Sequence, residues 1–357
     1  MTAPIKNILD HFRLDSGVLS YERYGSGHIN ETYLITTQNA AHYILQKIDH
    51  NIFCDVPGLL ENIVSVTEFL RKQADDPRSV PSIIFATDGN PYYRDDEGSF
   101  WRVLVFVEDT ICLQQPETPS DFYESAVAFG RFQQQLKDFP AHTLHETIPN
   151  FHNTVDRYRI FRETLEKNPM GRANQVREEI DFALAREDEA GTLVRLLAEG
   201  KLPLRVTHND TKLNNVLFDK ATRKALCVID LDTVMPGLSL YDYGDSIRFG
   251  AASAPEDEQD LSKMNLRLDL FESYTKGFLH ACPDLTELER ELLPLGAKLM
   301  TLECGVRFLT DYLDGDRYFA VHRPDHNLHR ARTQFKLVAD METKWEQMHQ
   351  IVSTCIQ

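Results

Sequence analysis

The pattern of apolar and polar residues separates a strand-rich N-terminal part of the chain from a helix-rich remainder. Residues 32–37 alternate apolar and polar side chains, which is typical of a half-buried strand, and residues 43–48 form a second strand-like run. Residues 101–107 are apolar almost throughout, which predicts a strand buried on both faces. Between them, residues 59–71 repeat apolar side chains at helical spacing. The first 110 residues therefore predict strands with one helix among them.

Helices dominate the pattern after residue 110. Thr118 precedes a proline and then an acid, Asp121, and this order is typical of the N-terminus of a helix. A capping box at Thr286 and Glu289 predicts another helix, and Pro294 should end or kink its first turns. Apolar spacing predicts the remaining helices at residues 153–167, 174–198, 257–280 and 326–352.

Composition and charge exclude several classes of protein. The 357 residues are 42% apolar and 26% charged, as in a globular protein, and the formal net charge is −17. Such an acidic balance argues against a nucleic-acid binder and against a protein drawn to anionic membranes. The chain shows no signal peptide and no run of about 20 apolar residues, and its six cysteines lack the spacing of a zinc site. We therefore expect a cytoplasmic monomer.

Residues 208–217, which read HNDTKLNNVL, carry the strongest chemical signal in the chain. Asp210 follows His208 by two positions, and Lys212 and Asn215 follow Asp210 by two and by five. This is the spacing of the kinase catalytic loop, H-x-D-x-x-x-x-N. In such a loop the carboxylate orients the acceptor hydroxyl and takes its proton, while the asparagine holds a Mg²⁺ ion. The lysine adds positive charge near the γ-phosphoryl oxygens, and the histidine supports the loop backbone.

A second motif follows about twenty residues later. The apolar segment at residues 227–229 leads into Asp230, as expected for the metal-binding aspartate of a kinase. Each motif also has an ordinary structural reading. An isolated His-x-Asp is usually a surface hydrogen bond, and an aspartate after an apolar strand is usually a turn or a helix cap. The two motifs in this order and at this separation favour a phosphotransferase.

The N-terminal part offers a candidate loop for the phosphates of a nucleotide. Residues 24–30 lie between two predicted strands, hold Gly25 and Gly27, and end at Asn30. Two glycines let the backbone come close to phosphate oxygens and point its N–H groups at them, although a plain hairpin turn is the alternative. Glu108 begins the segment that we expect to form a hinge against the adenine ring.

Together these features predict an α+β, bilobal, protein-kinase-like fold. Its N-terminal lobe should span residues 1–110 and carry the phosphate loop and the hinge. Its mainly helical C-terminal lobe should span residues 111–357 and carry the catalytic loop, the metal site and the acceptor pocket.

The motifs resemble those of the aminoglycoside phosphotransferase and choline kinase superfamily more than those of protein kinases. Asp230 stands in Ile-Asp-Leu-Asp instead of Asp-Phe-Gly, and no Ala-Pro-Glu segment follows. The superfamily places a structural aspartate in a Tyr-Asp motif, which points to Asp242, with Asp245 as the alternative. Within the superfamily the chain resembles the N-acetylhexosamine 1-kinase family at residues 25–30, 43–46, 205–215, 229–233, 244–250, 303–309 and 325–328.

This resemblance implies a reaction and a set of site residues. The family uses ATP and Mg²⁺ to phosphorylate the anomeric C1 hydroxyl of N-acetylglucosamine or N-acetylgalactosamine. Asp210 would then act as the base, Lys212 would face the γ-phosphate, and two Mg²⁺ ions would be held by Asn215 and Asp230. The resemblance implies polar contacts with the sugar from His28, Arg307 and Tyr318, and a wall for the acetyl group from Phe249.

One position departs from the usual kinase pattern. Most kinases have a lysine on the third strand of the small lobe that holds the α- and β-phosphates. Here Gln46 takes that place, and Lys47 should lie on the opposite face of the strand. If Gln46 is the phosphate contact, it contributes an amide donor without charge, so the metal ions must neutralise more of the triphosphate.

Several alternatives stay open at this stage. Another small-molecule kinase of the same fold could act on an aminoglycoside, choline or homoserine, and a catalytically inactive ATP-binding protein would fit the missing lysine. Glu303, Arg307 and Asp311 stand four residues apart, as in a solvated ladder of salt bridges on a helix. Tyr318 and Phe249 could be ordinary core or rim aromatics.

Overall fold

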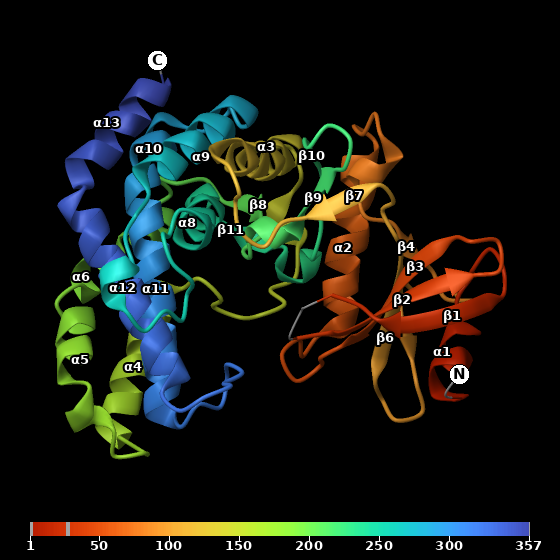
Figure 1. Cartoon of the computed structure of the whole chain (residues 1–357), viewed down its shortest axis with the longest axis horizontal. Coiled ribbons are helices and arrows are strands. Elements are labelled where there is room, and N and C mark those ends of the chain that lie inside the picture. The colour runs from red at the N-terminus through yellow and green to blue at the C-terminus, as the bar shows by residue number, and fades with distance from the viewer. Residues whose placement is uncertain (1–2, 26–28, 357) are drawn as a thin grey trace.

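The computed structural model describes residues 3–25 and 29–356. A strand-rich N-terminal region lies beside a larger helical region, and α2 (Val56–Arg71) stands between the two (Figure 1). This is the α+β, bilobal, protein-kinase-like fold that the sequence predicted. Among the described residues, no helix is long and apolar enough to cross a lipid bilayer.

The N-terminal sheet is antiparallel throughout. Its strands lie in the order β1 (Val18–Arg23), β2 (Glu31–Thr37), β3 (His42–Ile48), β6 (Phe100–Val105) and β4 (Ile83–Ile84), and β5 (Tyr93–Arg94) also pairs with β6. The short helix α1 (Ala3–Leu9) contributes Ile8 and Leu9 to a separate apolar core with this sheet. The prediction that β6 is buried on both faces is wrong at its end, because Val105 is 40% exposed where the strand stops.

Helix α2 belongs to the core of the helical region. Asp55 caps its N-terminus by accepting from the Gly58 N–H, and its apolar face joins the large cluster that includes the helices of the C-terminal region. Asn62 on this helix donates from Nδ2 to the Val234 carbonyl at 3.0 Å. The helix is therefore packed against the segment that follows Asp230.

Two small sheets in the C-terminal region carry the loops of interest. In one, β9 (Val216–Asp219) pairs with β7 (Thr110–Cys112) and with β10 (Ala225–Val228). In the other, β8 (Arg205–Thr207) pairs with β11 (Met235–Gly237). The catalytic loop connects β8 to β9, and the segment with Asp230 connects β10 to β11. The two pairings bring both connections to one side of the region.

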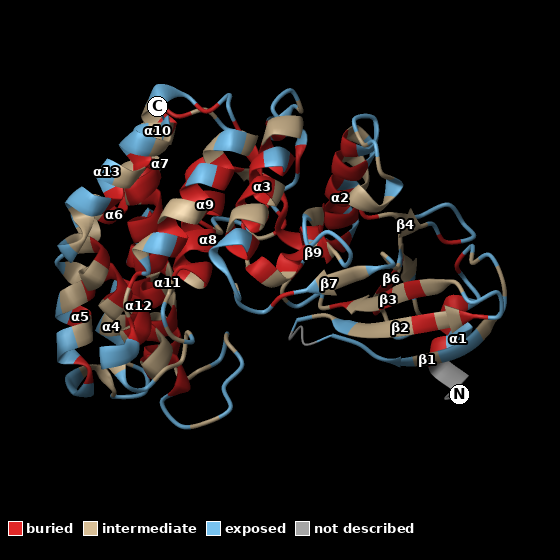
Figure 2. Cartoon of the chain, turned by 45° about the horizontal axis from the view of Figure 1, so that its top comes forward, coloured by how far each residue is buried: buried red, intermediate tan, exposed pale blue. Residues whose placement is uncertain are grey.

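The helices that surround these sheets bury their inner faces (Figure 2). Gly244 in α8 faces Gly296 in α11, where an added Cβ would come within 2.4 Å of the Gly296 carbonyl oxygen, so the two helices need glycine to approach this closely. The main helices are α3 (Pro119–Gln135), α4 (Thr154–Lys167), α8 (Ser239–Gly250), α9 (Leu268–Ala281), α11 (Leu293–Asp314), α12 (His326–Thr343) and α13 (Trp345–Ile356).

The helix N-terminus predicted at Thr118 and the capping box predicted at Thr286 are both confirmed, and the first is also a capping box. The side chains of Thr118 and Asp121 cap α3, and those of Thr286 and Glu289 cap α10 (Glu287–Glu291). The interruption expected at Pro294 is also confirmed, because α10 ends before it and the proline lies in the first turn of α11.

Three helix predictions were too long. Residues 174–198 form three short helices separated near Arg186 and Gly191, namely α5 (Arg177–Leu184), α6 (Glu187–Ala190) and α7 (Thr192–Ala198). Only α9 is an α-helix within 257–280, since the preceding polar residues form loops and one 3₁₀ turn, Leu261–Lys263. The last predicted helix is broken at Lys344, whose Nζ donates to the Leu266 carbonyl at 2.8 Å.

Candidate active site

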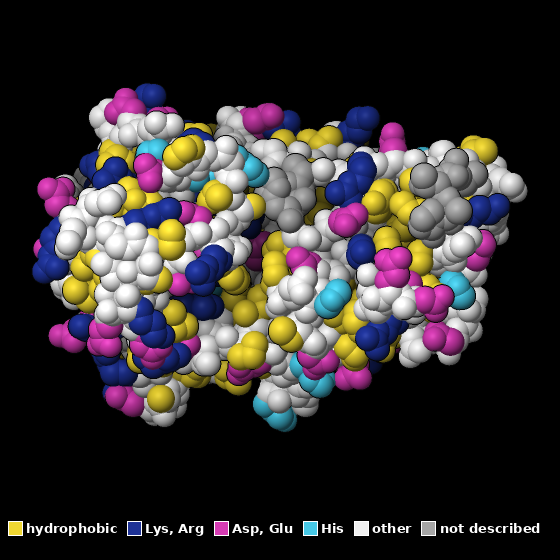
Figure 3. All heavy atoms as spheres, turned by 90° about the horizontal axis from the view of Figure 1, so that it is seen from below, with side chains coloured by type: hydrophobic (Ala, Val, Ile, Leu, Met, Phe, Trp, Pro, Cys, Tyr) yellow, Lys and Arg dark blue, Asp and Glu magenta, His cyan; other side chains and the backbone are white. Residues whose placement is uncertain are grey.

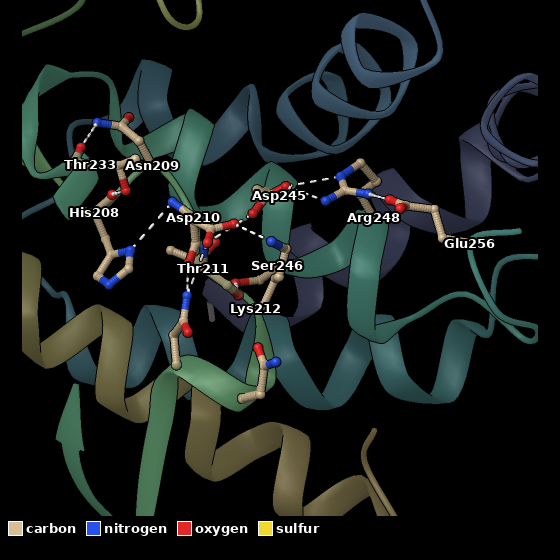
Figure 4. Close-up of polar contacts among 12 residues, drawn as sticks. His208, Asn209, Asp210, Thr211, Lys212, Thr233, Asp245, Ser246, Arg248 and Glu256 are labelled. Carbon is tan, nitrogen blue, oxygen red and sulfur yellow. Dashed lines mark hydrogen bonds and ion pairs between the residues drawn. The ribbon is translucent and has the colours of Figure 1, made fainter. Parts of the chain in front are cut away.

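The backbone of the catalytic loop is held by one buried carboxylate. Asp242 of α8 accepts hydrogen bonds from the backbone N–H of His208 at 2.9 Å and of Asn209 at 2.8 Å, and Gln133 donates to it at 2.7 Å. Asp242 therefore supports the loop backbone, as expected for the structural aspartate of the Tyr-Asp motif. Asp245, the alternative, contacts the same loop by accepting from the Thr211 N–H at 3.0 Å, and it pairs with Arg248 (Figure 4).

His208 lies behind the loop, fully buried against the ring of Phe129. Its Nε2 donates to the Ile229 carbonyl at 2.9 Å, and its Nδ1 accepts from the Asp210 N–H at 3.3 Å. These two bonds fix the tautomer and join the catalytic loop to the strand that leads into Asp230. The ring supports the backbone and has no surface open to a substrate.

Asp210, Lys212 and Asn215 come together at the front of the loop. Lys212 Nζ lies 2.8 Å from Asp210 Oδ1 (Figure 4). Asn215 Nδ2 donates to the Asp210 carbonyl at 2.8 Å and to Oδ2 at 3.2 Å. Burial alone would raise the pKa of Asp210, but Lys212 and, more weakly, Arg248 outweigh it and lower that pKa below its ordinary value. Asp210 is therefore ionised at neutral pH and can accept a hydrogen bond from a hydroxyl.

Asp230 is placed to meet a cation. Its backbone is left-handed, with φ 61°, as is that of Asn209, with φ 65°; such backbone strain in residues other than glycine is frequent at functional sites. The residue is exposed, but neighbouring protein replaces part of the hydration of its carboxylate. That desolvation, with the nearby charges of Asp232 and Asp210, raises the pKa of Asp230 to about 6. A bound cation would relieve this crowding of negative charge.

The donor set fits Mg²⁺ bound together with a nucleotide. No group of three or more His, Cys, Asp or Glu side chains suited to a metal is found in residues 3–25 and 29–356. Asn215 uses its Nδ2 within the loop, which leaves Oδ1 as an acceptor. Its backbone carbonyl accepts from the N–H of Ile229, the residue before Asp230, at 2.9 Å. Mg²⁺ is commonly held by one or two protein oxygens plus phosphate and water, so a site with two protein ligands agrees with that ion.

The predicted phosphate loop is described only at its two ends. Gly25 has a positive φ of 76°, which glycine adopts readily, whereas Gly27 and His28 lie outside the described residues. Asn30 donates from Nδ2 to Asp232 at 2.7 Å and accepts from the Asp49 N–H at 3.1 Å. The Asn30 side chain therefore ties this end of the loop to the segment just after Asp230.

The third strand differs from the prediction in one respect. Gln46 Nε2 donates to Thr32 Oγ1 at 3.2 Å, and Gln46 Oε1 accepts from Arg102 Nε at 2.9 Å. Lys47 lies on the other face of the strand, as predicted, with its Nζ 5.6 Å from the centre of the Trp101 ring. The cation beside Gln46 is thus Arg102, a residue that the sequence reasoning missed. The signal available in the sequence was that Arg102 is the one charged residue in the otherwise apolar segment 101–107.

Glu108 lies at the predicted hinge, where the chain passes from β6 to β7. Its exposed side chain contacts His42, with 2.6 Å between Oε1 and Nδ1. Nearby, the rings of Tyr24 and Phe106 meet edge to face at 5.8 Å.

On the side of the catalytic loop where we expect the phosphoryl acceptor (the acceptor side), several contacts converge on the buried carboxylate of Glu303 in α11. Its Oε1 lies 2.9 Å from His152 Nδ1, and its Oε2 accepts from Thr154 at 2.7 Å. The other ring nitrogen of His152 donates to the Asn209 carbonyl at 3.2 Å. His152 therefore joins the buried Glu303 to the backbone of the catalytic loop. Burial would raise the pKa of Glu303, but this histidine and nearby arginines lower it.

Arg307 lies one turn further along α11, among aromatic rings. Its guanidinium carbon is 5.1 Å from the ring centre of Phe151, 5.5 Å from that of Phe319 and 6.0 Å from that of Tyr318. These are cation–π distances. Tyr318 itself is 55% exposed, so it is not a core aromatic.

The reading of Glu303, Arg307 and Asp311 as a solvated salt-bridge ladder is wrong. Glu303 is 1% exposed and Asp311 is 6% exposed, and neither bonds to Arg307. Asp311 instead accepts from the backbone N–H groups of Arg317 at 2.9 Å and Tyr318 at 2.8 Å. It therefore shapes the turn that presents Tyr318 next to Arg307.

Phe249 is half-buried at the end of α8. It lines a small pocket with Arg248, Glu256 and Gln334, and no residue of the catalytic loop lines that pocket. In the space-filling view the surface is hollowed between the helical region and the N-terminal sheet, with apolar side chains along part of the hollow (Figure 3).

Comparison with known proteins decides the family. The sequence model of the phosphotransferase enzyme family (APH) matches residues 20–276. The chain belongs to this family. It is an ATP-dependent small-molecule phosphotransferase, and the loop with Asp210 and the segment with Asp230 lie inside the matched range.

Solved structures share the fold over nearly the whole chain. A microcompartment-associated aminopropanol kinase is 18% identical, with a TM-score of 0.66, and the match covers 98% of this chain and 99% of that one. A choline kinase from Cryptosporidium parvum Iowa II is 14% identical, with a TM-score of 0.64 and 99% of each chain covered. A spectinomycin phosphotransferase, solved with ADP and spectinomycin, is 12% identical, with a TM-score of 0.62 and coverage of 97% and 98%.

Proposed function

We propose that this phosphotransferase transfers the γ-phosphoryl group of ATP to the anomeric C1 hydroxyl of an N-acetylhexosamine, giving the sugar 1-phosphate. The observation that carries the proposal is the composition of the acceptor side. Arg307 lies among the rings of Phe151, Tyr318 and Phe319. One helical turn before it, Glu303 is buried and pairs with His152, which bonds to the catalytic loop. Such a surface offers the hydrogen-bond donors of a guanidinium next to the exposed Tyr318, which suits a neutral, hydroxyl-rich acceptor with an amide.

The same residues disfavour a cationic acceptor such as choline or an aminoglycoside. A quaternary ammonium group needs open aromatic faces or a free carboxylate. Here the guanidinium of Arg307 already lies over the rings, and Arg157 lies near enough that Arg307 helps to lower its pKa, after the larger effect of desolvation. The carboxylate of Glu303 beside this surface is buried and paired with His152. A second positive charge would be repelled at this surface.

The catalytic loop supports a direct, in-line transfer. Asp210 accepts the hydrogen bond of the C1 hydroxyl and takes its proton as the phosphoryl group arrives. Lys212 lies beside it and balances the charge of the γ-phosphoryl oxygens. Mg²⁺, held by Asn215 and Asp230, would neutralise the phosphates. Because the transition state is loose, positioning of the two substrates supplies most of the rate.

The test is ³¹P NMR of the protein with ATP and Mg²⁺ and one acceptor at a time. N-acetylglucosamine or N-acetylgalactosamine should give a new sugar 1-phosphate resonance. The matched control is the methyl glycoside of the same sugar, whose C1 oxygen carries no proton and which should give no product. A phosphate ester formed from choline, kanamycin or homoserine, with none from either N-acetylhexosamine, would contradict the proposed acceptor and leave the family's chemistry intact.

A further inference from the structure

A buried cation stands next to the position where most kinases carry their triphosphate-binding lysine. Gln46 of β3 pairs directly with Arg102 of β6 in the antiparallel sheet, so the two side chains point to the same face. Arg102 Nε donates to Gln46 Oε1 at 2.9 Å, while the amide nitrogen of Gln46 donates to Thr32. Gln46 therefore serves as an acceptor for Arg102 within the sheet.

The other end of Arg102 reaches the segment that follows the metal-binding strand. Its Nη1 lies 2.5 Å from Asp232 Oδ1, and Asp232 Oδ2 accepts from Asn30 at 2.7 Å. The side chains of Arg102 and Asp232 are only 3% and 4% exposed. Among the described residues, Arg102 Nη2 has no hydrogen-bond acceptor, although a guanidinium offers five donors in a fixed plane.

We propose that Arg102 binds the phosphates of ATP in place of the usual lysine, and that Gln46 positions it. The guanidinium bonds to Gln46, which occupies the sheet position of that lysine, and to Asp232, which follows Asp230 by two residues. A kinase holds its triphosphate between these two places. Arginine suits this role because its planar donors match phosphate oxygens in pairs. The inference rests on the family's use of ATP and is independent of the identity of the acceptor.

The neutral side chain at position 46 is then part of the same arrangement. A lysine there would place an ammonium group next to the guanidinium of Arg102 and would offer it no acceptor. Gln46 gives Arg102 an acceptor without adding charge. The missing lysine is thus explained by a cation supplied from the neighbouring strand, and it is no sign of an inactive enzyme.

The experiment is calorimetric titration of Arg102→Met with ADP plus Mg²⁺ and, separately, with adenosine. The affinity for ADP should fall about 10- to 100-fold, the effect of losing a hydrogen bond to a charged group, while the affinity for adenosine stays unchanged. Lys47→Met is the matched control, since it removes the neighbouring cation from the opposite face of the sheet. Its ADP affinity should stay within about twofold of wild type. No acceptor is present, so failure of the sugar assignment would not affect this result.

Because Arg102→Met leaves Asp232 buried without its cation, a second pair of variants guards against misfolding. Gln46→Lys alone should weaken ADP binding by crowding two cations. The double variant Gln46→Lys/Arg102→Gln exchanges the two side-chain types, so that one cation remains and lies on β3. Its affinity for ADP should recover to within about tenfold of wild type. Two results would overturn the proposal: a folded Arg102→Met with unchanged ADP affinity, or an exchange variant that folds and binds adenosine but binds ADP no better than Gln46→Lys.

Discussion

The catalytic loop and the N-terminal sheet hold their charges in opposite ways. In the loop, Asp210 and Lys212 are 28% and 37% exposed at their side chains, and bonds to the backbone from the buried Asp242 keep the loop in place. In the sheet, Arg102 and Asp232 are almost fully buried and depend on each other. In the loop, the residues that carry the proposed chemistry are therefore not the residue that holds the backbone in place. In the sheet, Arg102, which we propose binds phosphate, also belongs to a buried ion pair.

This difference predicts how each region responds to substitution. A change at an exposed loop charge should remove activity and leave the fold intact. A change at the buried pair should cost stability as well, because the remaining partner stays buried without compensation.

Asp210→Asn should lower kcat by about 1000-fold or more, because the amide cannot take the proton of the acceptor hydroxyl. The melting temperature and the affinity for ADP should remain close to those of the wild type. Release of ADP in a coupled assay measures the first quantity, and thermal unfolding and calorimetry measure the others. Residual activity above about a tenth of wild type would remove Asp210 from the mechanism.

Asp232→Asn should lower the free energy of unfolding by about 3 kcal/mol, because Arg102 would remain buried without a counter-charge. The matched control is Asp284→Asn, which disrupts the exposed pair with Lys137 and should change stability by less than about 1 kcal/mol. Urea denaturation of both variants gives the comparison. Equal, small effects would show that the buried pair contributes no more than a surface pair.

Asp242→Asn changes the residue of α8 that supports the catalytic loop, and it is the counterpart of Asp210→Asn in the loop itself. The amide keeps one acceptor oxygen, so one of the two loop N–H groups, of His208 or of Asn209, loses its partner in a buried place. The free energy of unfolding should fall by about 2 kcal/mol, with a smaller loss of kcat than in Asp210→Asn. A variant as stable as wild type would place the support of the loop elsewhere.

The smallest effect concerns pH. In the metal-free protein the pKa of Asp230 is raised to about 6 from its ordinary 3.8, so the folded state binds a proton more readily than the unfolded chain. The metal-free protein therefore gains stability from this group as the pH falls from about 6 toward 4. Bound Mg²⁺ competes with that proton, so the increase in melting temperature that Mg²⁺ gives in the presence of ADP should shrink as the pH falls through about 6. A constant increase from about pH 7.5 to pH 5 would contradict the assignment of Asp230 as a ligand.

The two regions also differ in how far the sequence could predict them. Asp210, Lys212 and Asn215 lie within six consecutive residues, so their spacing along the chain already implies their proximity. The helix N-terminus at Thr118 and the capping box at Thr286 were equally local predictions and were confirmed. Local patterns of this kind, together with the order of strands and helices, were enough to predict the fold.

Contacts between distant segments could not be predicted in this way. Arg102 meets Gln46 and Asp232 only because strands pair and two regions pack, and those residues are 56 and 130 positions away. Glu303 looked like part of an exposed ladder because helical spacing does not report burial, and its partner His152 is 151 positions away. The broken helices have the same cause, since apolar spacing continues across Gly191 and Lys344 although the helices end there.

The most direct test of the account uses N-acetylglucosamine that carries ¹⁸O at C1, incubated with the wild-type protein, ATP and Mg²⁺. Attack by that oxygen on the γ-phosphorus predicts a sugar 1-phosphate whose ³¹P resonance shows the isotope shift of a retained ¹⁸O bridge. The Asp210→Asn protein should give no such signal. A product that has lost the label, or labelled sugar that remains unphosphorylated while ATP is bound, would contradict transfer to the anomeric hydroxyl.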